Sequence, residues 1–227
     1  MKTTIDSAST PSRKGALLPP VFRWFSPHCV LRQIDSADVA RIWKAVLHPA
    51  FEHCFSVPVP QSERDVSDFV QSAQSDWRRG TRYVMAVQRK QTHEFVGWVE
   101  ASSTGGSQAP AGVWSLNWFI HPSCVTSSLA LEALTSATDL TMNALAARLI
   151  RADCDPRYAH FERLLRAAGF GKQVPAGSLD PDTARPRARA LFVMTRLDWH
   201  RVRNVQSSTA PLTLGGYAQP GAELTLL

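Results

Sequence analysis

The sequence predicts a single α/β domain built on a mixed sheet, and three observations carry this prediction. The chain has 227 residues, the length of one domain with tails. Apolar residues make up 44% and charged residues 19% of it, so the chain can bury a core and is not disordered overall. Segments of helical periodicity alternate with apolar runs that are typical of strands. This order is that of an α/β domain.

Two amphipathic helices open the predicted domain. Asp35 or Ser36 is suited to cap the first helix, and His48-Pro49 ends it, because the residue before a proline disfavours helix. The second helix begins at Ser62, which has the spacing of a capping box with Asp65. This helix carries an apolar stripe at Val66, Phe69, Val70, Ala73 and Trp77.

Three strands follow the two helices. Residues 83–88 and 95–101 are apolar runs joined by a short polar turn, as in a hairpin. A loop rich in serine and glycine comes next, and residues 113–120 form the third apolar run. We therefore expect these three segments to form the centre of the sheet.

The second half of the chain alternates helix and strand. Apolar residues recur at helical spacing over residues 126–146, and residues 149–154 read as a short strand. Asp155-Pro156 is an N-cap followed by proline at the first helical position, and Gly169 ends that helix. A last strand is predicted over residues 191–197.

The two ends differ in composition from the middle. Residues 1–27 and 204–227 are rich in Ser, Thr, Pro and Gly, so we interpret them as tails around a domain of residues 28–203. Three aromatic residues of the first segment are expected to dock on the core, namely Phe22, Trp24 and Phe25.

The cysteine pattern predicts a cytoplasmic protein. No two of the four cysteines lie closer than 25 residues apart, so they form no zinc or redox motif and are expected to be reduced thiols. No charged-then-apolar leader opens the chain, and no apolar stretch has the character of a membrane span. The histidines have no ligand spacing, so no metal is expected.

The site that the sequence indicates is the join between the strand 113–120 and the helix 126–146. The motifs GxSxG, GxGxxG, Walker A and HExxH are absent. A helix N-terminus leaves backbone N–H groups unpaired, and with the helix dipole these form an anion site. An ordinary strand-to-helix connection is the alternative interpretation.

The order of elements and four segments resemble the GNAT acetyltransferase superfamily, especially its Rim-type branch, which acetylates ribosomal proteins. The family's first strand and helix are similar to LRQIDSADVARIW, and the acetyl-CoA-holding strand, loop and helix to WFIHPSCVTSSLALEAL. The following strand and helix are similar to IRADCDPRYAHFERLLRAAGF, and the closing strand to LFVMTRLDW. The resemblance covers residues 29–202 and implies a mixed, mostly antiparallel sheet flanked by helices.

The resemblance implies acetyl-CoA as co-substrate, with a departure in the loop that holds its pyrophosphate. The family pattern is (Arg/Gln)-x-x-Gly-x-(Gly/Ala), and Ser123, Thr126 and Ser128 stand at those places. Serine and threonine keep the backbone N–H but add a Cβ that crowds the phosphates. No Lys or Arg occurs from residue 101 to residue 147. The implied cofactor-binding residues, which include the strand end that stabilises the oxyanion, are Phe119, Ile120, Ser123, Thr126, Ser127, Ser128, Leu129 and Ala130.

The implied catalytic residues depart further from the family. Its members usually carry Asn and, three residues later, Ser or Tyr in the Asp-Pro helix, where this chain has Tyr158 and Phe161. Phe161 cannot donate a proton, so Tyr158 is the candidate acid for the departing thiolate. Ser115 stands at the place of the glutamate found in some members, and Glu100 is the candidate base in its stead.

Two functions remain open at this point. The first is an N-acyltransferase that moves an acetyl group from acetyl-CoA to a primary amine, which could be a protein N-terminus, a lysine or a small amine. The second is a catalytically degenerate GNAT-fold module for binding or regulation. A third class, nucleic-acid or ribosome contact, is suggested by 12 basic against six acidic residues over 148–203, but a solvated face explains this bias, so nucleic acid is not expected as a partner. A homodimer is left open.

Overall fold

The structure, a computed structural model, describes residues 17–49, 59–104, 112–121, 123–124, 128–155, 159–173 and 190–208. Its strands are β1 (Arg23–Phe25), β2 (Cys29–Gln33), β3 (Arg82–Arg89), β4 (Phe95–Ser103), β5 (Val113–Ile120), β6 (Leu149–Cys154), β7 (Gly171–Gln173) and β8 (Ala190–Thr195). Its helices are α1 (Val39–Val46), α2 (Glu63–Arg79), α3 (Ser128–Asn143), α4 (Ala159–Ala167) and α5 (Arg196–Ser208), and a 3₁₀ turn (Ser36–Asp38) precedes α1.

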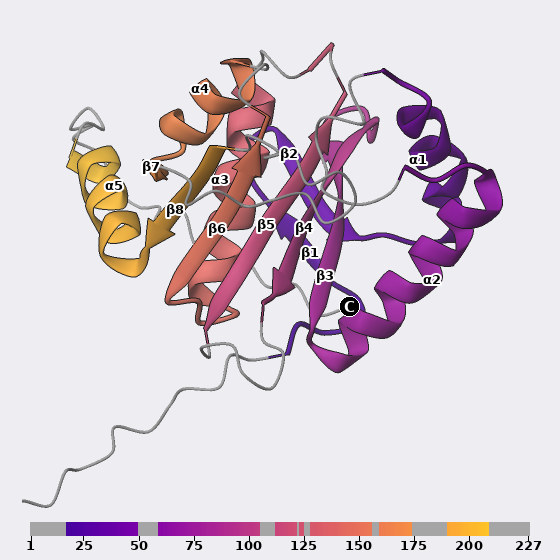
Figure 1. The fold of residues 1–227 in the computed structure, drawn as a ribbon, viewed down its shortest axis with the longest axis horizontal. Helices are drawn as coiled ribbons and strands as arrows, with labels where there is room; N and C mark the ends of the chain where they lie inside the picture. The colour runs from indigo at the N-terminus through magenta and orange to yellow at the C-terminus, as the bar shows by residue number, and fades with distance from the viewer. Residues whose placement is uncertain are drawn as a thin grey trace, which may run out of the picture.

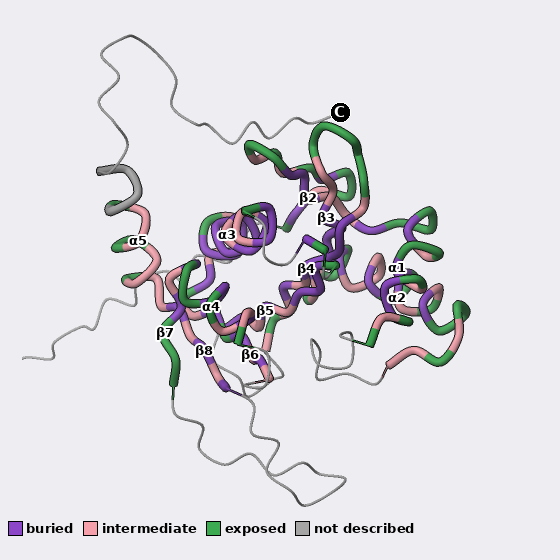
Figure 2. The backbone as a smooth tube through the Cα atoms, turned by 90° about the horizontal axis from the view of Figure 1, so that it is seen from above, coloured by how far each residue is buried: buried purple, intermediate pink, exposed green. Residues whose placement is uncertain are grey.

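The strands form one sheet in the order β1-β2-β3-β4-β5-β6-β8-β7. Every neighbouring pair is antiparallel except β5 and β6, which run parallel. Helices α1 and α2 cover one side of the sheet and α3 the other (Figure 2). The predicted class, a mixed and mostly antiparallel sheet flanked by helices, is confirmed.

The helix starts follow from the capping residues that the sequence offers. Ser62 accepts a hydrogen bond from the Asp65 N–H, and the Asp65 carboxylate accepts one from the Ser62 N–H, so the predicted capping box is confirmed. Gly80 ends α2 with φ +72°, a conformation that glycine adopts without strain. Asp35 caps the 3₁₀ turn that leads into α1.

The sheet begins earlier than the boundary expected at residue 28. Strand β1 pairs with β2 in antiparallel register, with Trp24 opposite Leu31. Phe22 is buried and Trp24 packs partly buried against the core, whereas Phe25 is exposed. Two of the three aromatic residues therefore dock as expected, and the segment before residue 28 contributes a strand to the sheet.

The end of the domain also differs, because the predicted strand over 191–197 stops at Thr195 and a helix follows. The Thr195 hydroxyl accepts a hydrogen bond from the Asp198 N–H at 3.2 Å, and the Asp198 carboxylate accepts from the Thr195 N–H at 3.3 Å. This reciprocal pattern is a capping box. Asp139 of α3 then holds α5 by accepting hydrogen bonds from Trp199 Nε1 and Arg203 Nε, each at 2.8 Å.

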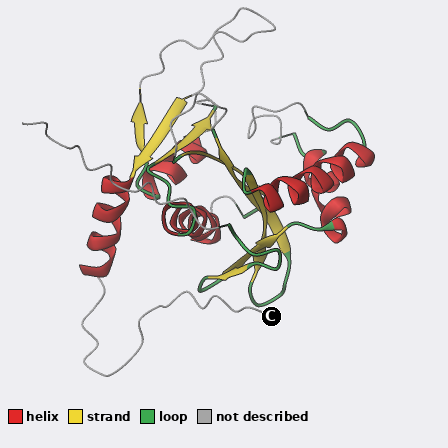
Figure 3. Ribbon diagram, turned by 90° about the horizontal axis from the view of Figure 1, so that it is seen from below, coloured by secondary structure: helices red, strands yellow, loops and turns green. Residues whose placement is uncertain are grey.

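Strands β5 and β6 pair over three residues only. Val113, Trp114 and Ser115 face Leu149, Ile150 and Arg151, and the pairing then stops. Beyond this point the two strands diverge (Figures 1 and 3). The second half of β5 therefore has one edge without a neighbouring strand, and this open edge positions the candidate site.

Within the described part of the chain, no helix combines the length and apolar character needed to cross a membrane. The same residues contain no group of three or more His, Cys, Asp or Glu that could hold a metal ion.

Candidate functional site

The open edge of β5 presents alternate backbone N–H groups. The N–H of His121 donates to Val96 of β4 at 2.8 Å. Because successive residues of a strand turn their N–H groups to opposite sides, the Phe119 N–H also faces β4, and those of Trp118 and Ile120 face the open edge. Of the two oxyanion donors expected from the sequence, the Ile120 N–H is thus on the open edge and the Phe119 N–H is turned away from it.

Trp118 is a functional candidate that sequence reasoning missed. Its side chain is buried and lies edge-on to Phe161 of α4, with ring centroids 6.2 Å apart. Among the described residues the buried indole Nε1 has no hydrogen-bond partner. Buried donors are almost always paired in native proteins, so this N–H calls for a partner beyond these residues. The sequence shows that Trp118 lies near the end of a predicted strand, but not that its indole lacks a partner.

The N-terminus of α3 lies beyond the end of β5. The helix begins at Ser128, so the N–H groups of Ser128, Leu129 and Ala130 have no acceptor within the helix. Ser128 is exposed, whereas the side chains of Leu129 and Ala130 are buried in the core. A ligand here would therefore meet their backbone rather than their side chains. Thr126 and Ser127 lie outside the described residues.

Ser123, the first residue of the altered loop pattern, is described and exposed. Its Oγ lies 2.8 Å from Nδ1 of His121. Tyr158, the candidate acid, lies outside the described residues. Phe161 is described, and its buried ring faces Trp118 in the place where the resemblance implied a hydroxyl group.

Glu100, the candidate base, lies on the opposite face of the sheet from Trp118. It stands directly across from Asn117, so the two share a face, and Trp118 as the next residue belongs to the other face. Glu100 lines a cavity of about 540 Å³ between the sheet and helices α1 and α2, together with Ile42 and Phe69.

Burial raises the pKa of the Glu100 carboxyl above its ordinary value, and the Arg82 charge and a hydrogen bond with Asn117 offset part of this rise. Arg82 Nη1 is 3.9 Å from the Glu100 carboxylate, but Arg82 Nε binds Asp76 at 2.8 Å. The guanidinium is thus held mainly by Asp76. Glu100 is therefore a buried carboxylate that is only loosely paired, which suits a proton acceptor.

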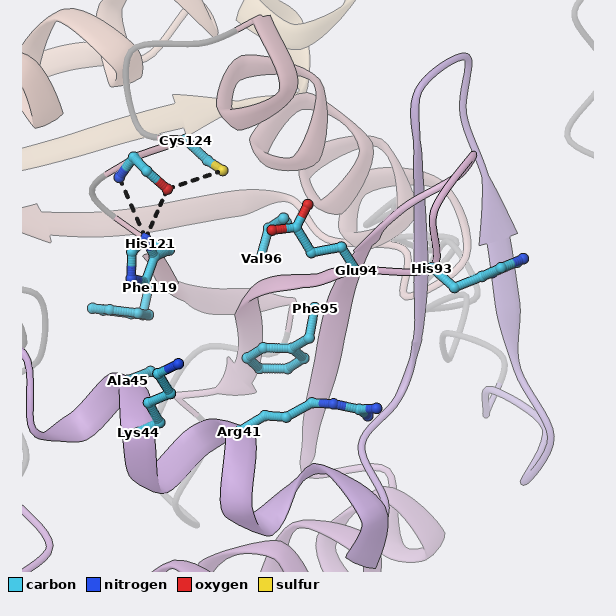
Figure 4. A pocket seen from close by; sticks show the side chains of 11 residues that line it. Arg41, Lys44, Ala45, His93, Glu94, Phe95, Val96, Phe119, His121 and Cys124 are labelled. Atoms are coloured by element: carbon cyan, nitrogen blue, oxygen red, sulfur yellow. Dashed lines mark hydrogen bonds between the residues drawn. The ribbon is translucent and has the colours of Figure 1, made fainter.

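A second cleft, of about 450 Å³, lies between α1 and the ends of β4 and β5. Its lining includes Arg41 and Lys44 from α1 and His121 from the loop after β5 (Figure 4). Sequence reasoning missed this group because it read the histidines as scattered. The available signal was the pair of cations Arg41 and Lys44, three residues apart on one predicted helix. Their closeness to His121 becomes visible only in the folded structure.

The comparisons with known proteins address the fold and the family. The family model described as Acetyltransferase (GNAT) domain matches residues 28–171. A comparison with curated proteins finds no match. Several solved structures share the fold at low sequence identity.

A GCN5-related N-acetyltransferase from Brucella melitensis has a TM-score of 0.67 and 15% identity, covering 87% of this chain and 90% of that one. The ribosomal-protein-S5-alanine acetyltransferase from Vibrio fischeri has a TM-score of 0.64 and 16% identity, covering 78% and 98%. Mycobacterium smegmatis RimJ, solved in complex with CoA-disulfide, has a TM-score of 0.62 and 15% identity, covering 82% and 94%. The family match spans more than half of the chain, and the chain belongs to the GNAT acetyltransferase family.

Proposed function

We propose that this protein transfers an acetyl group from acetyl-CoA to a primary amine. Family membership supports acetyl transfer in general. The observation that carries the proposal for this chain is the open edge of β5, where the buried indole N–H of Trp118 has no partner in the part of the chain that the structure describes. An acyl-CoA arm lying along this edge would supply the missing hydrogen-bond acceptor, since it carries amide and thioester carbonyl groups.

The backbone supplies the remaining cofactor contacts in this proposal. The N–H groups of Trp118 and Ile120 point to the open edge, and the Ile120 N–H would stabilise the oxyanion that forms from the thioester carbonyl. The first turn of α3, which starts at Ser128, would receive the pyrophosphate, because unpaired N–H groups and the helix dipole both favour anions. Thr126 and Ser127 remain residues that the sequence predicts to contact acetyl-CoA.

Glu100 would remove a proton from the acceptor amine, directly or through water. Its raised pKa makes it a stronger base than an exposed glutamate. The amine nitrogen then attacks the thioester carbonyl, the C–N bond forms, the C–S bond breaks, and the CoA thiolate takes up a proton. Tyr158 stays the proposed donor of that proton. Trp118 can donate a hydrogen bond to the leaving group but cannot protonate it, because indole is a donor only.

The experiment combines acetyl-CoA titration by calorimetry with measurement of CoA release in the presence of amines. We expect the wild-type protein to bind acetyl-CoA and to release CoA in an amine-dependent manner. Glu100→Gln should lower kcat by about 10²–10⁴ and leave acetyl-CoA affinity unchanged. Glu63→Gln, at the exposed start of α2, is the matched control and should change neither quantity. An unchanged rate in Glu100→Gln would remove Glu100 from the mechanism.

A second candidate function is a binding or regulatory module that keeps the fold without the chemistry. It is favoured by Phe161, whose buried ring stands where the resemblance implied a proton donor. Acetyl-CoA binding without transfer to any amine would support this module, and absence of acetyl-CoA binding by the folded protein would reject acetyl transfer and leave the module standing. A cytoplasmic location and a homodimer stay predictions.

A further inference from the structure

The cleft between α1 and the ends of β4 and β5 is lined on two sides by cationic or hydrogen-bond-donating side chains. Figure 4 shows Lys44 and His121 on one side of the Phe95 ring, whereas Arg41 runs along α1 and its guanidinium lies on the other side. Phe119 supplies a second apolar wall. A cleft of about 450 Å³ can hold a small molecule or a short stretch of peptide.

The charge in this cleft is positive. A carboxylate that lines it, Glu94, pairs with Arg89 at 3.2 Å. Lys44 is exposed, and among the described residues no carboxylate pairs with it. An unpaired cation at the mouth of a cleft attracts anions, and this attraction is screened by salt.

The second cation of α1 is only partly neutralised. Arg41 Nη1 is 3.3 Å from the carboxylate of Asp38. That carboxylate is fully buried and already binds both Nη atoms of Arg32, at 2.6 and 2.7 Å. Asp38 thus pairs mainly with Arg32, and the guanidinium of Arg41 has N–H groups left that can donate hydrogen bonds to a ligand in the cleft.

His121 adds a hydrogen-bond donor. Its Nδ1 accepts a hydrogen bond from the Ser123 N–H at 3.4 Å, and the Ser123 hydroxyl is 2.8 Å from the same atom. With Nδ1 acting as acceptor, Nε2 carries a proton and can donate it in a hydrogen bond. Lys44 and His121 thus offer donors to an oxyanion on one side of Phe95, and Arg41 offers them on the other side.

The cleft opens on the same face of the sheet as Glu100. Phe119 lies two residues from Asn117, which stands across from Glu100, so their side chains share this face. Helix α3, whose N-terminus is the proposed phosphate site, covers the other face (Figure 2). Asn117 and His121 are four residues apart along the chain, about 13 Å at ~3.3 Å per residue. Ser123, a predicted cofactor contact, also lines the cleft. Because the cleft shares the face of Glu100 and not that of α3, we assign an anion in it to the acceptor rather than to the CoA phosphates.

We infer that this cleft binds the carboxylate of an acidic acceptor peptide. An extended peptide also advances ~3.3 Å per residue, so a span of about 13 Å places the acidic side chain within the first five residues of a peptide whose N-terminal amine is acetylated. This inference rests on the proposed acetyl transfer and adds to it the chemical class of the acceptor.

The test compares hexapeptides that carry Glu, Gln or Lys at the third position and a free N-terminus. Each is titrated onto the protein saturated with CoA, and each is assayed for acetyl transfer. The wild-type protein should bind the Glu peptide about tenfold more tightly than the Gln peptide, as expected for a hydrogen bond between charged groups. The preference should shrink as salt is raised. Lys44→Met should abolish the preference and leave acetyl-CoA affinity unchanged.

Arg78→Met is the matched control, because it removes one positive charge from an exposed position on α2 outside the cleft. It should keep the preference for the Glu peptide. Equal binding of the Glu and Gln peptides by the wild-type protein would overturn the inference and leave acetyl transfer intact. If Lys44→Met weakens acetyl-CoA binding instead, the cleft belongs to the cofactor phosphates and the inference is wrong. Failure of the wild-type protein to bind acetyl-CoA would refute the proposed function itself.

Discussion

Replacing Trp118 with phenylalanine should separate stability from cofactor binding. In the ligand-free protein the substitution removes a buried N–H that has no partner among the described residues, which relieves about 1–3 kcal/mol of desolvation cost. The smaller ring loses packing worth about 1–2 kcal/mol. These effects oppose each other, so we expect Tm to rise or to fall by no more than about 4 °C. Acetyl-CoA loses one hydrogen bond, and its Kd should rise about 3–10-fold.

Trp77→Phe is the matched control for this prediction. Trp77 is also buried, but its Nε1 donates to the backbone oxygen of Pro19 at 3.0 Å. The same substitution there loses packing and also orphans an acceptor, which costs about 2–5 kcal/mol and lowers Tm by roughly 4–20 °C. Acetyl-CoA affinity should not change. Differential scanning fluorimetry and calorimetric titration measure both quantities.

The reasoning would be refuted if Trp118→Phe lowered Tm as much as Trp77→Phe and bound acetyl-CoA like the wild-type protein. That result would mean that the Trp118 indole has a structural partner, such as a buried water, rather than a ligand. The ¹⁵N–¹H signal of the Trp118 indole gives an independent measurement. It should move downfield when acetyl-CoA is added, and it is identified by its absence in Trp118→Phe.

Two further predictions concern the frame around the site. Burial raises the pKa of Glu132, but hydrogen bonds, including one from the His28 N–H at 2.6 Å, outweigh burial and lower this pKa in the folded protein. The stability that Glu132 contributes is therefore fully present above its unfolded pKa of about 4.3, and it is lost as pH falls through the lower pKa of the folded state. Glu132→Gln should therefore lower Tm by about 3–12 °C at pH 7, and the difference should narrow in acid; a constant difference across pH would contradict this assignment. Asp139→Asn should weaken the hydrogen bonds that Asp139 accepts from Trp199 and Arg203. Trypsin should then cut α5 several-fold faster than in the wild-type protein, with cleavage elsewhere in the domain unchanged, as measured by mass spectrometry. An unchanged cleavage rate would show that α5 is held by other contacts.

Local signals allowed most of the fold to be predicted. The spacing of Ser62 and Asp65 marks the start of α2 without reference to other elements. Helix α5 was missed because Thr195 ends an apolar strand and also caps the helix, so the apolar pattern runs over the boundary. Capping signals were thus more informative than hydrophobicity where two elements meet directly.

The candidate site could be predicted only in part. The join of β5 and α3 was found because both elements are local features of the sequence. That Trp118 lacks a partner, and that Lys44 lies across a cleft from His121, depend on elements distant in the chain. No pattern along one segment carries that information, and without the fold a buried tryptophan reads as ordinary core.

The way α3 sits on the sheet has a consequence for how this protein relates to its family. The helix contacts β2, β4, β5 and β6, so it bridges both halves of the sheet across the place where β5 and β6 separate. The first turn of α3 is thereby positioned by a helix that is anchored on the sheet. The residue at the start of the helix can then vary, as with Ser128 in place of a glycine or alanine, while the first-turn N–H groups proposed to bind the pyrophosphate keep their position. A comparison of backbone geometry will then identify relatives whose side chains in the phosphate-binding loop no longer match the family pattern.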